Sequence, residues 1–111
     1  MARRGAEEER RVARHYRLRG YRILGRNVWA GGNELDLIVR RGGRLVFCEV
    51  KAKGGDRFGD PLAMVDDEKL RRLVRAAEAW LARHPDALRL DARFEVAAVR
   101  DGRVERVPLD L

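Results

Sequence analysis

Three residues in the middle of the chain have side chains and a spacing that could do chemistry together. Glu49 and Lys51 are separated by one residue, and Asp36 lies in the preceding segment. Residues i and i+2 of a β-strand point to the same side of a sheet, so a strand would present the Glu49 carboxylate and the Lys51 amine together. Crowded carboxylates are costly to bury unless a cation lies between them, and Mg²⁺ and Mn²⁺ prefer oxygen ligands of this kind. The three residues therefore predict a divalent-metal site with a lysine beside it.

The spacing of Glu49 and Lys51 also has a simpler interpretation. Charged residues make up 39% of the chain, so one Glu-x-Lys tripeptide is expected by chance. In that case the two side chains form a solvent-exposed ion pair worth at most about 1 kcal/mol. A simple ion pair would leave the other carboxylates on compatible faces without a role: Asp36, Glu34 and Glu9. We therefore favour the metal site.

Two expected strands joined by a glycine turn would bring Asp36 alongside Glu49. In residues 34–40 the alternation of side chains predicts one apolar face and one face with both carboxylates: Leu35, Leu37 and Val39 against Glu34, Asp36 and Ile38. In residues 45–52 it again predicts two faces: Val46, Cys48 and Val50 against Leu45, Phe47, Glu49 and Lys51. Gly42 and Gly43 between them suit a hairpin turn, because glycine tolerates positive φ. Cys48 is therefore expected to be a buried core residue.

The remaining segments supply two helices and three more strands. We expect helices over residues 6–19 and 66–83, and strands over residues 21–29, 34–40, 45–52, 92–100 and 103–109. Glu9 lies in line with the apolar stripe of the first helix, and Asp66 and Asp67 serve as residues that begin the second. This order predicts an α/β fold: one domain over residues 1–111, with a mixed sheet of about five strands flanked by helices.

The net charge of +7 is spread unevenly along the chain. Residues 1–30 carry +6, residues 31–69 carry −1 and residues 70–111 carry +2. Basic flanks attract a polyanion, whereas an acidic cluster between them would repel it unless a cation were bound there. The pattern is consistent with a metal site that faces phosphate, although arginines that merely solvate helix faces would give the same totals.

The composition also limits the cellular setting and the kinds of metal site. No segment approaches the roughly 18 consecutive apolar residues of a membrane span, and the N-terminus lacks the apolar core of a signal peptide. We therefore expect a soluble, cytoplasmic protein with no membrane partner. Cys48, His15 and His84 are too few and too scattered for a disulfide or a zinc site.

Several motifs along the chain resemble those of a known family. They include Glu34-Leu35-Asp36-Leu37-Ile38, the segment Leu45–Lys51, Phe58-Gly59-Asp60-Pro61, Val65, Lys69, Glu9, Gly20-Tyr21-Arg22-Ile23-Leu24, Asn27 and Arg93-Phe94. The chain resembles the YraN-like bacterial family (UPF0102), which is placed in the PD-(D/E)XK nuclease superfamily and is similar to archaeal Holliday junction resolvases. The resemblance implies a restriction-endonuclease-like three-layer core. Three positions depart from the usual family pattern: Asn33 in place of glycine, Lys53 in place of arginine and Glu95 in place of aspartate.

The resemblance assigns roles to individual residues. Asp36 matches the aspartate that binds metal, Glu49 the second acidic ligand, and Lys51 the lysine that orients or polarises the attacking water. Glu9 matches the first-helix glutamate that completes the acidic site in resolvase-like proteins. Val50 and Glu34 join the metal-site residues beside Asp36 and Glu49. Outside this site, Arg57 and Lys69 are candidates for phosphate contacts.

The activity implied is hydrolysis of phosphodiester bonds in DNA, including branched or structured DNA, with Mg²⁺ or Mn²⁺ as the cofactor. One alternative is a DNA-processing protein that keeps the fold and binds nucleic acid without turnover. Another is a structural protein whose basic segments bind an acidic partner. One site per chain cannot cut two strands symmetrically, so the resemblance to resolvases also implies a homodimer. The alternative is a monomer that forms pairs only on DNA.

Overall fold

The computed structural model describes residues 5–52 and 65–110. Every element that the sequence predicts is present, with small shifts at its ends. In chain order the elements are α1 (Ala6–Leu18), β1 (Arg22–Ala30), β2 (Asn33–Arg41), β3 (Arg44–Ala52), α2 (Asp67–Arg83), the short 3₁₀ helix η2 (Pro85–Arg89), β4 (Asp91–Arg100) and β5 (Arg103–Leu109). Asp66 caps α2 as expected, because its side chain accepts a hydrogen bond from the main-chain N–H of Lys69 at 2.8 Å.

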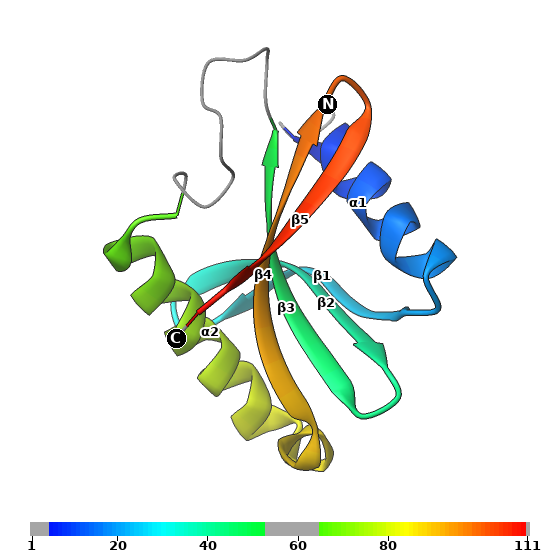
Figure 1. The fold of residues 1–111 in the computed structure, drawn as a ribbon. Helices are drawn as coiled ribbons and strands as arrows, with labels where there is room; N and C mark the ends of the chain where they lie inside the picture. Colours follow the sequence, from blue (N-terminus) through cyan, green and yellow to red (C-terminus); the bar gives the residue numbers. More distant parts are fainter. Residues whose placement is uncertain (1–4, 53–64, 111) are drawn as a thin grey trace.

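The five strands form one mixed sheet in the order β1-β2-β3-β4-β5. Neighbouring strands are antiparallel except β3 and β4, which are parallel and are connected through α2. Helix α1 covers one face of the sheet and α2 the other (Figure 1). The architecture is thus a three-layer α/β fold, consistent with the restriction-endonuclease-like core that was expected.

Two apolar clusters hold the helices on the sheet. Under α2, Trp80 and Leu73 pack against Phe47 and Phe94. Under α1, the buried residues are Val12, Ala13, Tyr16, Tyr21, Leu37, Val39, Val46, Cys48, Ala97 and Val99. Cys48 is buried, as predicted from its strand face. Among the described residues, no helix is long and apolar enough to cross a membrane.

The predicted alternation of β2 is wrong at Leu35. This residue belongs to the α2 cluster with Ile38, whereas Leu37 and Val39 belong to the α1 cluster. The pairing of β2 with β3 extends only to Leu37 opposite Cys48. The β1–β2 pair continues beyond that point to Asn33. Beyond the part paired with β3, the β1–β2 hairpin lies on the α2 side (Figure 1). Leu35 there joins the α2 cluster.

The turn between β1 and β2 is closely packed against α2. A side-chain Cβ at Gly31 would lie 2.9 Å from the main-chain oxygen of Arg75, so this position requires glycine. Gly31 and Gly32 supply the positive φ angles of the turn, 57° and 76°. Asn33 begins β2 and donates a side-chain hydrogen bond to the main-chain oxygen of Gly31 at 3.1 Å. The turn therefore does not need Asn33 to adopt a positive φ.

Candidate metal centre

Asp36 lies where β2 separates from β3. Its Oδ2 accepts a hydrogen bond from the main-chain N–H of Val50 on β3 at 2.8 Å, across the gap where the ladder has ended. Burial and the negative charge of Glu49 raise the pKa of Asp36 from 3.8 to about 7, despite the opposing effect of the Val50 N–H. Ionised Asp36 is therefore costly in this position unless positive charge is brought to it.

A group of three carboxylates includes Asp36. Glu9 from α1 and Glu34 and Asp36 from β2 each place an oxygen within 4.8 Å of the others. Asn27 on β1, whose φ is 50°, orients two of them: its Nδ2 donates to Glu9 Oε1 at 3.1 Å and lies 3.5 Å from Glu34 Oε1. The three side chains thus converge from two elements that are far apart in sequence.

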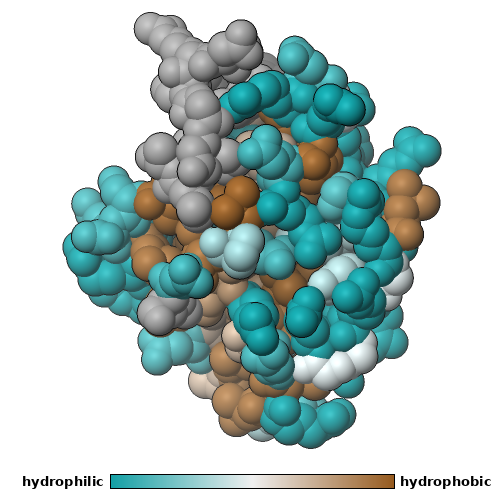
Figure 2. Space-filling view, in the orientation of Figure 1, coloured by the Kyte–Doolittle hydropathy of each residue, from teal (hydrophilic) through white to brown (hydrophobic). Residues whose placement is uncertain are grey.

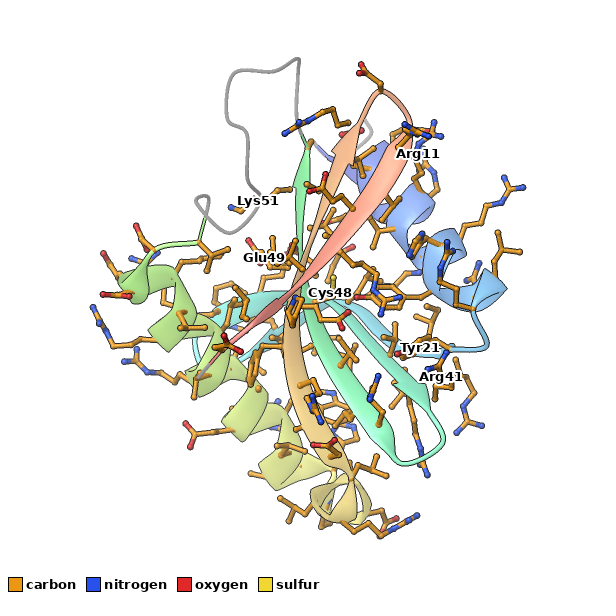
Figure 3. The ribbon with its side chains drawn as sticks, viewed as in Figure 1. Arg11, Tyr21, Arg41, Cys48, Glu49 and Lys51 are labelled. Atoms are coloured by element: carbon orange, nitrogen blue, oxygen red, sulfur yellow. The ribbon has the colours of Figure 1, made fainter. Side chains whose placement is uncertain are left out.

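Glu49 on β3 is a neighbour of Asp36 and is the buried charged residue of the described core, with 4% of its surface exposed. Its Oε2 is 3.3 Å from the Lys51 Nζ and 3.2 Å from the Lys69 Nζ, which comes from α2. Its Oε1 is buried and has no hydrogen-bond partner among the described residues. Figure 3 shows Glu49 and Lys51 on the same strand, on the side of the sheet that faces α2.

The orphaned oxygen of Glu49 gives a direct test of whether a cation fits. A buried carboxylate oxygen without a partner costs free energy, and native proteins rarely leave one in that state. Asp36 and Glu49 share a side-chain hydrogen bond when one of them holds a proton, and the pKa of Asp36 is raised. When both are ionised, the Glu49 oxygen has no donor, a state that a cation would relieve. Oxygen ligands in this number suit Mg²⁺ or Mn²⁺ better than softer metals. The described residues therefore fit a divalent ion.

A hollow of about 330 Å³ opens onto this arrangement. Its lining combines the carboxylates with two cations of α2, and it includes Glu9, Glu34, Asp36, Glu49, Val50, Lys69 and Arg72. A second hollow, of about 170 Å³, also reaches Asp36, and its lining includes Glu9, Arg10, Arg26 and Asn27. Asp36 thus lines two hollows, each of which also has an arginine in its lining.

The structure brings together six of the residues expected at the site. Asp36, Glu9 and Glu34 form the three-carboxylate group, while Glu49, Val50 and Lys51 lie beside it on β3. Glu49 does not belong to the group that lies within 4.8 Å. Lys69, a candidate for a phosphate contact, pairs with Glu49 and also lines the hollow. Arg57 lies outside the described residues.

Sequence reasoning missed three contributions to the site. The contact of Lys69 with Glu49 depends on where α2 crosses the sheet, which no local pattern reveals. The link that Asn27 makes to Glu9 depends on a positive φ inside a strand. The residue type gave part of this signal, since asparagine is among the few residues that tolerate a positive φ. For Arg26 the sequence predicted a strand position but no role at the site.

Comparison with known proteins assigns the chain to a family. A family model described as "Uncharacterised protein family UPF0102" matches residues 8–99. The chain is 46% identical to a UPF0102 protein of Frankia casuarinae over 88 residues, which cover 79% of this chain and 74% of the relative. It is 44% identical to one of Symbiobacterium thermophilum over 108 residues, covering 94% and 91% of the two chains. A relative in Halorhodospira halophila is 43% identical over 95 residues, covering 86% and 75%. The chain therefore belongs to the UPF0102 family.

Proposed function

We propose that this protein is a Mg²⁺- or Mn²⁺-dependent endonuclease that hydrolyses phosphodiester bonds in DNA, including branched or otherwise structured DNA. The observation that carries the proposal is the buried Glu49. One of its oxygens contacts two lysines, and the other has no partner among the described residues. Its neighbour Asp36 has a raised pKa. An ion pair on a solvated surface would show neither feature.

Each group has a distinct task in the proposed reaction. Asp36 and Glu49 hold the divalent ion, with Glu9 and Glu34 closing the acidic side of the site. When bound, the ion supplies a water of lowered pKa and neutralises charge that develops on the phosphate. Lys51, whose amine is 3.3 Å from Glu49, orients the attacking water in this proposal. Lys69, at 3.2 Å from the same oxygen, keeps Glu49 in place from the α2 side.

The exposed side of α1 favours nucleic acid as the partner. A hollow of about 530 Å³ beside the β4–β5 turn is lined by four arginines, Arg10, Arg11, Arg14 and Arg19, together with residues that include Glu7, His15 and Leu18. The surface over α1 is largely hydrophilic (Figure 2). Arg10 is partly neutralised by Glu7 at 2.6 Å, whereas Arg14 is exposed. Such a surface attracts phosphate backbones without reading sequence.

The basic surface alone would also suit the second candidate, a nucleic-acid-binding protein without turnover. Cleavage separates the two. We would incubate the protein with linear duplex, single-stranded and four-way-junction DNA in Mg²⁺ and in Mn²⁺, beside Asp36→Asn and Glu49→Ala. Glu78→Gln, which removes an exposed carboxylate of α2, is the matched control. The proposal expects metal-dependent cleavage by the protein and the control, and none by the two site variants.

Binding of all three DNAs without cleavage in any condition would favour the binding protein instead. Binding that weakens steeply with salt would support either nucleic-acid function over a protein that binds an acidic partner. We further propose a homodimer, because symmetric cutting of paired strands needs two sites related by a two-fold axis. Light scattering at several concentrations tests this proposal, and a mass that stays near 12.7 kDa would remove it.

A further inference from the structure

Trp29 is a large apolar side chain exposed to solvent on the strand pair that carries Glu34 of the acidic group. It is 67% exposed, whereas the other tryptophan, Trp80, is 5% exposed and packs edge-on against Phe47. Trp29 lies near the end of β1, directly opposite Glu34 of β2. Side chains of directly opposite residues project from the same side of a sheet, about 5 Å apart at their Cβ atoms. The indole therefore stands beside one of the three clustered carboxylates.

The neighbours of Trp29 fix the face from which it projects. Val28 and Ala30, on either side of it, pack into the cluster under α2. Alternation along the strand places Trp29 on the opposite face, the one where Asn27 reaches Glu9 and Glu34. That face is not covered at Trp29, because most of the indole remains exposed. The side chain is thus exposed on the same face as the acidic group, next to Glu34.

We propose that Trp29 is a stacking platform for an unpaired base of the nucleic acid bound at the acidic site. This inference rests on the proposed function and extends it to the class of substrate, namely nucleic acid with unpaired bases next to the phosphate that occupies the site. Aromatic rings bind unpaired bases by stacking on their faces, which are hidden in an intact duplex.

The charges around Trp29 favour a nucleic acid over another occupant. Arg26, on the same strand, lines the hollow that leads to Asp36 together with Arg10. Arginines on that side can contact phosphates while the indole contacts a base, which is the combination that single-stranded nucleic acid requires. Within residues 5–52 and 65–110, the other strongly exposed apolar residues, Leu18 and Leu88, lie at the end of α1 and in η2 and not on the hairpin that carries Glu34.

Tryptophan fluorescence tests this proposal directly. We would titrate the protein with a single-stranded, a forked and a fully paired DNA oligonucleotide in Ca²⁺, following intrinsic fluorescence and the anisotropy of labelled DNA. The variants are Trp29→Leu, which removes the ring, Trp29→Phe, which keeps a smaller one, and Leu88→Ala as a control. Because Trp29 is exposed, these substitutions are expected to leave thermal unfolding unchanged.

We expect single-stranded and forked DNA to quench the emission of the protein but not that of Trp29→Leu, in which Trp80 remains as an internal reference. Trp29→Leu should bind these two DNAs roughly 5- to 150-fold more weakly, the range measured for removal of a stacking aromatic residue. Trp29→Phe should lose less affinity. Fully paired DNA should bind all four proteins alike.

Three results would overturn the inference. If DNA binds while Trp29 is neither quenched nor needed, the stacking platform is wrong and the proposed nuclease function stands. If no oligonucleotide binds at any salt concentration, the proposed function falls and the inference falls with it. If the emission of Trp29 shifts to shorter wavelength as the concentration of the protein alone is raised, a second copy of the chain covers the indole instead.

Discussion

Replacing Asp36 by asparagine should make the metal-free protein more stable at neutral pH. The substitution keeps an oxygen that can accept the hydrogen bond from the Val50 N–H, which is 2.8 Å long. It removes a charge that lies in a partly buried position beside Glu49. The variant therefore separates the cost of the charge from the loss of a contact.

The size of the effect follows from the pKa of Asp36. A rise from 3.8 to about 7 corresponds to about 4 kcal/mol, since one pKa unit is worth about 1.4 kcal/mol. Asp36 is partly exposed, so solvent screening reduces this figure, and we expect a gain of about 1–3 kcal/mol for Asp36→Asn. Glu78→Gln, on the exposed face of α2, should change stability by less than about 0.5 kcal/mol.

The gain should depend on pH in a defined direction. Between the ordinary and the raised pKa, the folded protein holds a proton on Asp36 that the unfolded chain has released. The stability that Asp36 contributes is therefore complete below pH 3.8 and is lost as pH rises through about 7. Urea unfolding with a chelator should show Asp36→Asn and the natural protein nearly equal near pH 4 and furthest apart near pH 8. A difference that does not change with pH, or a less stable variant at pH 8, would refute this reasoning.

Three further predictions concern the ion, the core thiol and a polar cluster under α1. Because a bound ion must displace the proton from Asp36, Mn²⁺ affinity measured by calorimetry should rise by up to about tenfold per pH unit below pH 7 and level off above it. Burial raises the pKa of Cys48 to about 12, so a thiol reagent should label it only at the rate of unfolding; rapid labelling of the native protein would contradict the position of β3. Glu95 accepts hydrogen bonds from the Tyr16 hydroxyl at 2.7 Å and the Arg106 Nε at 3.0 Å, so Glu95→Ala should lower the free energy of unfolding by about 2–4 kcal/mol and Glu95→Gln by less, as urea titration would show.

Features set by neighbouring residues could be predicted from the sequence. Asp101 and Gly102 both adopt positive φ, 51° and 76°, in the hairpin turn that their types indicated. The faces of β3 were predicted correctly because this strand is paired along its length with β4. In a regularly paired strand, alternate side chains lie on opposite faces of the sheet. The buried face of Cys48 could therefore be predicted from its position in the alternation.

Features set by the packing of distant elements could not be predicted in this way. Leu35 lies in the part of β2 that precedes the pairing with β3, which begins at Leu37, and no local sequence pattern marks where that pairing begins. Asp36, which bonds to Val50, lies in the same part of β2. Lys69 reaches Glu49 only because α2 crosses the sheet there. The sequence could name the acidic residues of the site but not the lysine that comes to them from α2.

Calorimetric titration with Mn²⁺ at pH 7.5, on the natural protein, Asp36→Asn, Glu49→Ala and Glu78→Gln, tests most directly whether these carboxylates hold a divalent ion. Asp36 and Glu49 supply the unfavourable charge and the unpartnered oxygen that a cation would relieve. Binding should therefore be measurable for the natural protein and for Glu78→Gln, and lost in both site variants while their folds remain intact. Unchanged Mn²⁺ affinity in Asp36→Asn and Glu49→Ala would contradict the assignment of the metal centre and, with it, the proposed nuclease.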